Sequence, residues 1–348
     1  MTRMDDGSQW RDALRHQLQA RLRGKAKPVG ALGRIETLAL QIGMATGSLE
    51  PDLGSAKIVV FAGDHGLTAE GVTAYPSAVT RDIAKLVLAG SAGINVCARA
   101  VGAPVILVDA GLLRPLAEHT ALLDRRIGAG TKNSRREPAM SHDQCNAALV
   151  EGRAIDAALG HEGVGIIAFG EIGIGNSSAA ALVAHTLTGI GLDKLAGPGA
   201  GVPPLGLDHK RQVLTETIAC APIDEPDLAM RAFETLRQFA GFEMVMMAGA
   251  MMAAAAERRV IIVDGFIGTA VAIAAAGIKP EILDHCVFAH CSAEPGHRVL
   301  LEYLQVQPLF DLGMRLGEGT GAALAIPMVR AAEMLLREMA DLPGEHPA

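Results

Sequence analysis

The chain has 348 residues, of which 50% are hydrophobic but only 3% aromatic, and its 31 basic and 38 acidic side chains give a formal net charge of −7. This length suits one large α/β domain with an accessory part, and an acidic balance without a lysine or arginine stripe argues against a nucleic-acid partner. The N-terminus carries acids where a signal peptide needs an apolar block, and the 5 cysteines are widely spaced. We therefore expect a cytoplasmic protein with reduced cysteines in its core.

Five short apolar runs recur along the chain, and each ends in a polar or glycine residue. They cover residues 57–62, 104–109, 164–169, 260–264 and 286–290. Such runs are typical of parallel strands that are covered on both faces and carry ligand-binding loops at their carboxyl ends. The sequence therefore predicts an α/β fold with a Rossmann-like, mostly parallel sheet and helices on both faces.

Helical segments lie between these runs. Capping-box spacing begins a helix over 141–159, and a second helix is expected over 208–221. The apolar run 244–256 is shorter than the roughly 20 residues that a membrane-spanning helix needs, so we expect a buried helix and no membrane partner. The glycines and prolines of 195–207 predict an irregular ordered loop or lid.

The two ends of the chain show helical periodicity with charged faces, over 8–22 and 325–340. We expect residues 1–45 and 325–348 to pack together as a small helical subdomain. Residues 46–324 then form the large α/β catalytic domain. No low-complexity linker or internal repeat separates the two parts.

Two turns combine glycines with a glutamate. Glu318 lies between Gly317 and Gly319 before a predicted helix, and Glu171 begins a similar turn within residues 170–178. Glycines let the backbone come close to a ligand, and the amides that open a helix naturally face an anion. Two such turns predict one site that is built from two strand ends.

Nine short motifs, most of them built around glycine, occur in order along the chain. They occupy residues 27–36, 61–66, 74–76, 93–96, 130–133, 137–140, 170–176, 289–297 and 311–321. Together they resemble the nicotinate-nucleotide:dimethylbenzimidazole phosphoribosyltransferase family, which makes the α-ribazole phosphate of the cobamide lower ligand. The resemblance covers roughly residues 20–340, and nine motifs in one order are far more specific than a single glycine turn.

The resemblance implies a reaction. Enzymes of this family displace nicotinate from nicotinate mononucleotide with a ring nitrogen of a benzimidazole-type base, and they invert the anomeric carbon. Glu318 matches the catalytic base that takes the azole proton. Glu171 matches a second carboxylate, which would stabilise positive charge on the ribose. The resemblance implies no metal or other cofactor, and it implies a homodimer whose partner chain helps to close the site.

The remaining predicted site residues would hold the two substrates. For the nucleotide and its phosphate we expect contacts from Gly173, Gly175, Asn176, Ser177, Gly199, Lys210, Gly317 and Gly319. For the incoming base and the floor of the site we expect Asp64, His65, Tyr75, Pro76, Ser77 and Asp82. Asp64 and His65 follow a strand and are interpreted as hydrogen-bonded supports, in preference to a metal site or a general base.

One departure from the family pattern falls in the pocket for the incoming base. Many members carry glutamine in a Val-Thr-x-Gln-Met sequence, where this chain has Asp82. An amide both donates and accepts hydrogen bonds, whereas an ionised carboxylate only accepts. We hypothesise that Asp82 favours a base with an N–H or O–H donor, such as a hydroxybenzimidazole or a purine, which competition between bases in one reaction would test.

Other interpretations of the same residues stay open. A glutamate among glycines can serve only as a helix N-terminal charge, and Lys210 can be a surface residue. A nicotinamide-dependent oxidoreductase would need a G-x-G-x-x-G turn, which neither glycine turn provides. A catalytically silent or mixed-dimer paralogue would bind a base or nucleotide without turnover, but it would have no need of Glu318.

Overall fold

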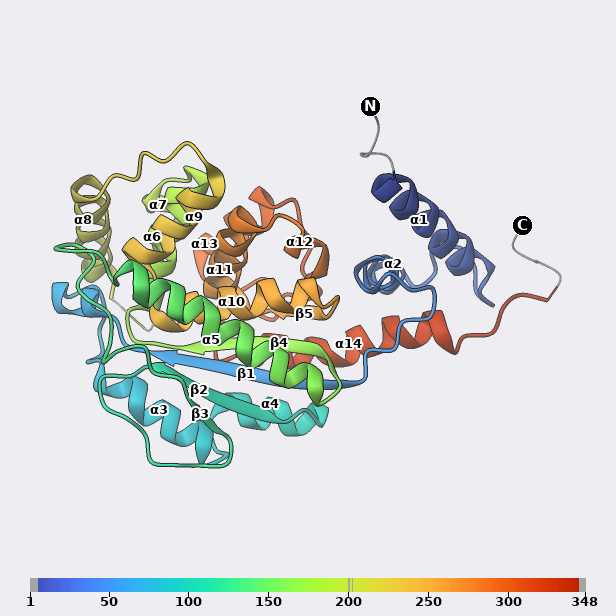
Figure 1. Cartoon of the computed structure of the whole chain (residues 1–348), viewed down its shortest axis with the longest axis horizontal. Helices are drawn as coiled ribbons and strands as arrows, with labels where there is room; N and C mark the ends of the chain where they lie inside the picture. Colours follow the sequence, from blue (N-terminus) through green and yellow to red (C-terminus); the bar gives the residue numbers. More distant parts are fainter. Residues whose placement is uncertain (1–5, 200, 202, 344–348) are drawn as a thin grey trace.

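A parallel sheet of six strands forms the centre of the computed structural model, which describes residues 6–199, 201 and 203–343. The strands lie in the order β3–β2–β1–β4–β5–β6, and every neighbouring pair is parallel (Figure 1). They are β1 (Ser55–Gly63), β2 (Val105–Gly111), β3 (Leu122–Asp124), β4 (Val164–Ile172), β5 (Val260–Val263) and β6 (Cys286–Phe288). The direction of winding reverses between β1 and β4, as in doubly wound nucleotide-binding folds. The predicted Rossmann-like sheet is confirmed.

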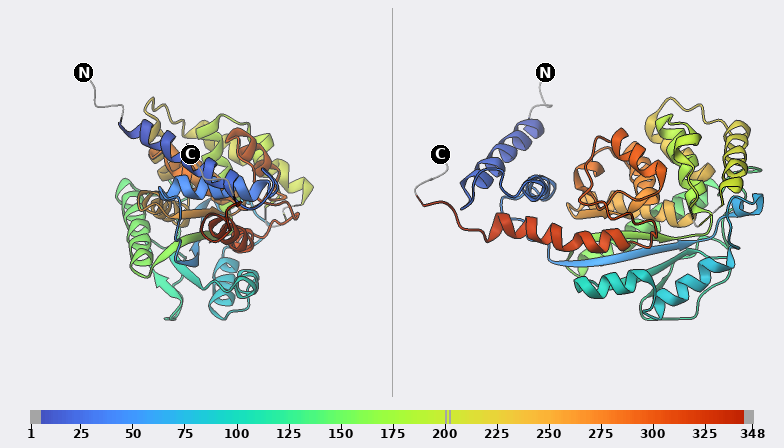
Figure 2. Two further views of the ribbon diagram at one scale, coloured as in Figure 1. Left: turned by 90° about the vertical axis from the view of Figure 1, so that its right-hand side faces the viewer. Right: turned by 180° about the vertical axis from the view of Figure 1, so that it is seen from behind.

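Helices cover both faces of the sheet because side chains alternate along each strand. In β1, Val59 and Phe61 belong to one apolar core, and Ile58, Val60 and Ala62 belong to the other. The first face packs against α5 (His142–His161), α10 (Phe242–Ala256) and α11 (Gly265–Ile278). The second packs against α3 (Ala78–Leu88), α4 (Gly93–Val101) and α14 (Thr320–Arg337), with α2 (Arg34–Thr46) beyond α14 (Figure 2).

Small residues allow the helices on the first face to pack closely. Helix α10 is apolar on all sides and lies in the interior, as the run 244–256 predicts. A Cβ atom at Gly152 of α5 would lie 2.0 Å from the carbonyl oxygen of Met246, and one at Gly249 of α10 would lie 2.3 Å from that of Leu149. The two helix backbones therefore touch, which explains how a chain with few aromatic residues fills its core.

Further helices surround the elements named above. They are α1 (Asp6–Gly24), η1 (Gly66–Glu70), α6 (Asn176–Thr188), α7 (Leu192–Leu195), α8 (Pro204–Cys220), α9 (Leu228–Phe239), α12 (Ile282–His285) and α13 (Pro295–Tyr303).

The expectation of irregular backbone throughout 195–207 is wrong for its last residues, because Pro204 occupies the first helical position, where its missing N–H costs nothing. The expectation of core cysteines is wrong for Cys220, which is exposed at the end of α8.

The two ends of the described chain lie side by side. The segment after α1 pairs with the segment after α14: Lys25 forms an ion pair of 3.0 Å with Asp341, and the amide of Ala26 donates to the carbonyl oxygen of Ala340 over 2.8 Å. Figure 1 shows α1, α2 and the end of α14 at one end of the molecule. Their apolar side chains continue into the core of the second sheet face. The division into residues 1–45 with 325–348 and residues 46–324 stays a prediction, because α14 crosses the second boundary without a break.

One stretch, Ala78–Val101, has the length and composition of a membrane span. The structure divides it into α3 and α4, which both pack on the sheet. Only 28% of the most apolar part of this stretch is buried. The two helices therefore leave apolar side chains on the surface of the described chain.

Candidate active site

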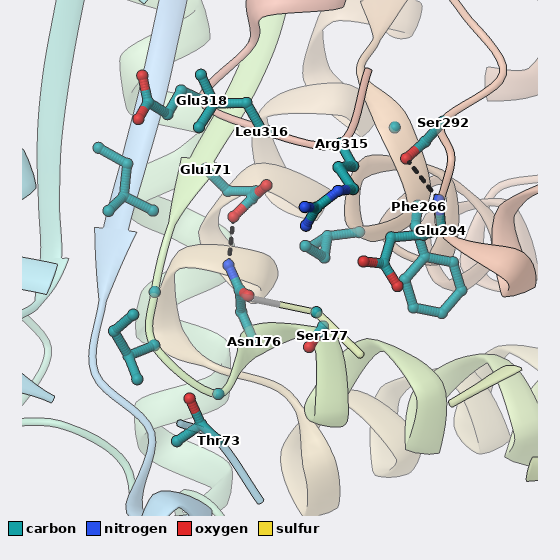
Figure 3. Close-up of a pocket in the computed structure, with 18 of the residues that line it drawn as sticks. Thr73, Glu171, Asn176, Ser177, Phe266, Ser292, Glu294, Arg315, Leu316 and Glu318 are labelled. Carbon is teal, nitrogen blue, oxygen red and sulfur yellow. Dashed lines mark hydrogen bonds between the residues drawn. The ribbon is translucent and has the colours of Figure 1, made fainter. Parts of the chain in front are cut away.

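A cavity of about 390 Å³ opens at the carboxyl ends of β4, β5 and β6 (Figure 3). Each strand delivers a polar side chain to it: Glu171 lies in β4, Asp264 follows β5 and His290 lies just beyond β6. The turn before α14 adds Glu318. Ligands of doubly wound folds bind at this edge of the sheet.

Glu318 adopts a backbone conformation that most residues avoid. Its φ angle is +61°, and those of Gly317 and Gly319 are +80° and +86°. A left-handed conformation is unfavourable for a side chain with a Cβ atom, and such strain persists only where the surroundings hold it. The Glu318 side chain is 7% exposed, and its Oε2 accepts a hydrogen bond of 3.1 Å from the amide of Ile94 in α4.

Asp264 holds the turn that carries Glu318. Its carboxylate is buried and accepts hydrogen bonds from the amides of Gly319, over 3.0 Å, and Ala322, over 2.9 Å. The Nε2 atom of His290 lies 3.3 Å from the same carboxylate. The end of β5 thus satisfies the free amides at the start of α14, and it also fixes the direction of the Glu318 side chain.

Strand β4 supports the same turn by direct contact. A Cβ atom at Gly170 would lie 2.4 Å from the backbone carbon and oxygen of Glu318. Glycine is needed at Gly170 because any side chain would overlap the backbone of this turn. The close contact places Glu318 beside Glu171, the next residue of the strand.

Glu171 is almost fully enclosed. Its carboxylate accepts a hydrogen bond from the side-chain amide of Asn176, the first residue of α6, and it is 7% exposed. Burial raises its pKa well above the usual range, and the neighbouring carboxylates of Asp264 and Glu243 add to the effect. Burial and Asp264 also raise the pKa of Glu318, which the amide of Ile94 partly offsets. Both carboxylates would therefore be stabilised by a cationic group of a ligand in the cavity.

A cation lies at the opposite side of the cavity, on α8. The Lys210 ammonium donates to the Ser177 hydroxyl over 3.1 Å and to the carbonyl oxygen of Gly197 over 3.0 Å. Its side chain is 1% exposed, which excludes the surface alternative, and burial lowers its pKa to about 8. Because Ser177 belongs to the first turn of α6, the ammonium and the free amides of that helix face the same space.

Asp64 and His65 lie beneath the cavity and do not line it. His65 Nε2 lies 2.7 Å from Glu243 Oε1, and Asp64 accepts a hydrogen bond of 2.8 Å from the amide of Leu113. A Cβ atom at Gly173 would lie 3.2 Å from His65 Nε2. The histidine ring therefore supports the turn between β4 and α6 from below.

Comparison with known proteins adds independent evidence. The profile of the Phosphoribosyltransferase family matches residues 8–344. The nicotinate-nucleotide–dimethylbenzimidazole phosphoribosyltransferase of Cupriavidus necator is 46% identical over 338 residues, which cover 96% of this chain and 95% of that protein. The protein of the same name from Variovorax paradoxus is 44% identical over 330 residues, covering 94% and 92%. The chain belongs to this phosphoribosyltransferase family.

Solved structures of the nicotinate-nucleotide–dimethylbenzimidazole phosphoribosyltransferase family share the fold. The crystal structure of CobT from Thermus thermophilus is 38% identical and matches with a TM-score of 0.89, covering 94% of this chain and 97% of that one. A second crystal structure, of the enzyme of that family name from the same organism, is 37% identical with a TM-score of 0.88 and covers 94% and 96%. The resemblance carried by the nine sequence motifs is confirmed.

The structure brings most of the predicted site residues of this phosphoribosyltransferase to one cavity. Those that line it are Tyr75, Glu171, Gly173, Gly175, Asn176, Ser177, Gly199, Lys210, Gly317 and Glu318. The others lie behind or beside it: Asp64, His65, Pro76, Ser77, Asp82 and Gly319. Their roles in binding and catalysis stay predictions.

Asp82, the predicted base-pocket residue that departs from the family pattern, does not line the cavity. Its side chain is 68% exposed, and it accepts a hydrogen bond of 2.9 Å from Lys85 one turn further along α3. Its neighbour Ile83 lines the cavity instead. Successive helical residues point about 100° apart, so only one of the two can face inward. Asp82 therefore lies outside the cavity in this chain, and its contact with the base stays a prediction.

Further polar residues line the cavity without having been assigned a role from the sequence, among them Asp264, His290 and Arg315. Asp264 and His290 end two predicted strand runs, so their position at the sheet edge was the available signal. Arg315 lies two residues before the Gly317 to Gly319 turn. Figure 3 shows its guanidinium pointing into the cavity beside Glu171 and above Asn176.

A substitution at Gly170 tests whether contact with β4 positions Glu318. We expect Gly170→Ala to lower the free energy of unfolding by about 1–3 kcal/mol, because the added methyl group overlaps backbone atoms that cannot rotate away. Chemical denaturation would measure it, and nicotinate release by the same variant would fall. Gly24→Ala is the matched control, since a Cβ atom there meets nothing within 4 Å. Equal stability of the two variants would contradict the role of this contact.

Proposed function

We propose that this chain transfers the 5-phosphoribosyl group of nicotinate mononucleotide to 5,6-dimethylbenzimidazole or a related base. The products are nicotinate and α-ribazole 5′-phosphate, which is used to assemble the nucleotide loop of cobalamin or another cobamide. One observation carries the proposal: Glu318 and Glu171 line the same cavity as Lys210. The names of the relatives support the same substrates.

The charges of the cavity complement those of the nucleotide. Nicotinate mononucleotide carries two anionic groups, the phosphate and the ring carboxylate, and one cationic group, the pyridinium nitrogen. Among the described residues, two cationic side chains line the cavity, Lys210 and Arg315, and carboxylates face the space between them. We infer that Lys210 and the start of α6 bind the phosphate, and that Arg315 binds the ring carboxylate.

The reaction needs a base at Glu318. The unprotonated ring nitrogen of the benzimidazole attacks the anomeric carbon, the bond to nicotinate breaks, and its electron pair returns to the pyridine nitrogen. The attacking base would become cationic unless its other nitrogen loses a proton, which the Glu318 carboxylate accepts. Its raised pKa brings it closer to neutrality, where a general base is most effective.

Glu171 stabilises the positive charge that develops on the ribose. As the bond to nicotinate breaks, positive charge moves from the pyridinium ring to the ribose. An ionised carboxylate in a water-poor cavity stabilises that charge more strongly than water does. The bound pyridinium cation favours the ionised form of Glu171 and so opposes the effect of burial on its pKa.

The substitution Glu318→Gln tests the assignment of the base. It preserves the size of the side chain and removes the proton acceptor, so we expect kcat to fall by about 10²–10⁴ while nucleotide binding is largely kept. Nicotinate release in the presence of a benzimidazole measures the rate, and calorimetry measures binding. An unchanged rate would place the base elsewhere. Binding by the wild-type chain without any nicotinate release would favour the catalytically silent paralogue.

Proton release tests the state of Glu171. Burial raises the pKa of Glu171 in the ligand-free chain, and the pyridinium cation should lower it again, so nucleotide binding should release protons over the pH range between the two pKa values. Calorimetry in buffers of different ionisation enthalpy counts that proton. Glu171→Gln should reduce the release, whereas proton release that is unchanged in this variant would disprove the assignment.

Discrimination between nucleotides tests Arg315. Nicotinamide mononucleotide has an uncharged amide in place of the ring carboxylate, so the wild-type chain should prefer the nicotinate form. We expect Arg315→Gln to reduce this preference by about tenfold or more, because a charge-assisted hydrogen bond is lost only for the carboxylate. The ratio of kcat/KM for the two nucleotides measures it. A preference that survives the substitution would assign Arg315 to another part of the ligand.

We also infer that the chain works as a cytoplasmic homodimer. Helices α3 and α4 leave Leu86 and Val96 exposed to 50% and 56%, and Tyr75 at the cavity is exposed to 50%. Apolar side chains gathered beside a binding site are typical of a surface that a partner subunit covers. Sedimentation of the purified chain would test this, and a monomer at all concentrations would contradict it.

A further inference from the structure

An ion-pair cluster outside the cavity joins two of its walls. Its centre is Glu70, the last residue of η1, whose side chain is 8% exposed. The Glu70 carboxylate accepts hydrogen bonds from Asn133 Nδ2 over 2.6 Å, Arg135 over 2.5 Å and Arg136 Nε over 3.2 Å. Three donors on one enclosed carboxylate form a rigid centre and not a loose surface pair.

The first wall that Glu70 reaches is α8, the helix that carries Lys210. Arg135 also pairs with Glu216 of that helix. The backbone carbonyl oxygen of Glu70 lies 2.8 Å from Nε2 of His209, the residue next to Lys210. Two separate contacts, one near each end of the helix, therefore link α8 to the end of η1.

The second wall follows Glu70 directly in the chain. Val72, Thr73 and Tyr75 line the cavity. Gly71 makes the turn between them with a φ angle of +74°, and a Cβ atom there would lie 3.4 Å from His209 Nε2. The spacing between this wall and α8 is thus set by the contacts of Glu70 and Gly71.

The position of α8 matters because the Lys210 ammonium acts from the end of a long side chain. Within the described residues, its own anchors are the Ser177 hydroxyl, which lines the cavity, and the carbonyl oxygen of Gly197. A bound phosphate would compete with both for the ammonium. Apolar packing of Val213 and Leu214 holds the middle of the helix. The Glu70 cluster adds contacts that stay in place when a ligand competes for the lysine.

We propose that Glu70, acting through Arg135 and His209, is a positioning residue that holds α8 at the distance from the Val72 to Tyr75 wall at which Lys210 binds the ligand phosphate. The proposal deepens the proposed function and rests on its phosphate site. It also assigns a role to Asn133, a residue of the 130–133 motif that has no part in the proposed reaction.

Two variants separate positioning from general stability. Glu216→Gln removes the charge that pairs with Arg135 and keeps an oxygen for the hydrogen bond that Glu216 accepts from Gln212 of the same helix. We expect KM for nicotinate mononucleotide to rise about two- to fivefold. Glu70→Gln weakens the centre itself, and we expect a rise of about tenfold. In both, kcat should change less than KM, and KM for nicotinate riboside, which lacks the phosphate, should not change. Lys210→Ala removes the phosphate contact completely and so gives the KM increase that corresponds to its full loss.

A matched control removes an ion pair of similar exposure elsewhere. Glu162→Gln breaks the pair with Lys57 at the amino-terminal ends of β1 and β4, far from the cavity edge of the sheet. We expect it to shift the melting temperature as Glu216→Gln does and to leave both KM values unchanged. Equal losses for nucleotide and riboside, or a KM change in the control as large as in the cluster variants, would overturn the proposal.

A binding measurement keeps the test independent of turnover. Calorimetry with ribose 5-phosphate and with ribose compares the same variants without a reaction. The proposal expects weaker binding of ribose 5-phosphate alone in the Glu70 and Glu216 variants, and unchanged affinity in both variants would overturn it. Failure of the proposed function shows instead as absence of nicotinate release by the wild-type chain.

Discussion

The buried carboxylate of Asp264 is the interaction on which the site depends. It follows β5 and accepts the amides of Gly319 and Ala322, so the end of one strand holds the start of α14. Without an acceptor those amides would be buried and unpaired, which costs about 1–3 kcal/mol for each group. The left-handed conformation of Glu318 adds a further cost, which this anchor offsets. The direction of the Glu318 side chain therefore depends on a residue at the end of a different strand.

The arrangement also explains why so many acidic groups gather in one place. Asp264 is satisfied by amides and by His290, so its charge is held in place. Glu171 and Glu318 lack an equivalent set of donors, and each feels the charge of Asp264. At an effective dielectric constant of about 20, two charges 4 Å apart interact by about 4 kcal/mol, which is enough to raise a neighbouring pKa markedly. A cationic group of a ligand would therefore meet two carboxylates whose pKa values burial and neighbouring charge have raised.

The sequence predicted the layers of the fold better than the direction of individual side chains. Five of the strands were recognised to within a few residues because they are buried runs with polar ends, whereas the three residues of β3 are only half-buried or exposed and form no such run. Glu318 and Glu171 could be found because glycines surround them. Asp82 was misplaced because a one-residue difference on α3 turns a side chain from the cavity to solvent. Asp264 had only its position at the end of a predicted strand as a signal, and Arg315 had none of its own, because the fold is what brings both side chains into one cavity.

Without a bound ligand, the buried charged groups of the site lower the stability of the folded chain. Glu171 and Glu318 have raised pKa values, so between their unfolded and folded values the native state holds more protons than the unfolded chain, and stability falls as pH rises through that window. Lys210, with its pKa lowered to about 8, carries a burial penalty that is fully present below that pH and is relieved as pH rises toward its unfolded value. Near neutral pH both ends of the cavity therefore oppose folding. A ligand with a cation at one end and a phosphate at the other removes both penalties together, so the chemistry that selects the substrate also stabilises the enzyme that binds it.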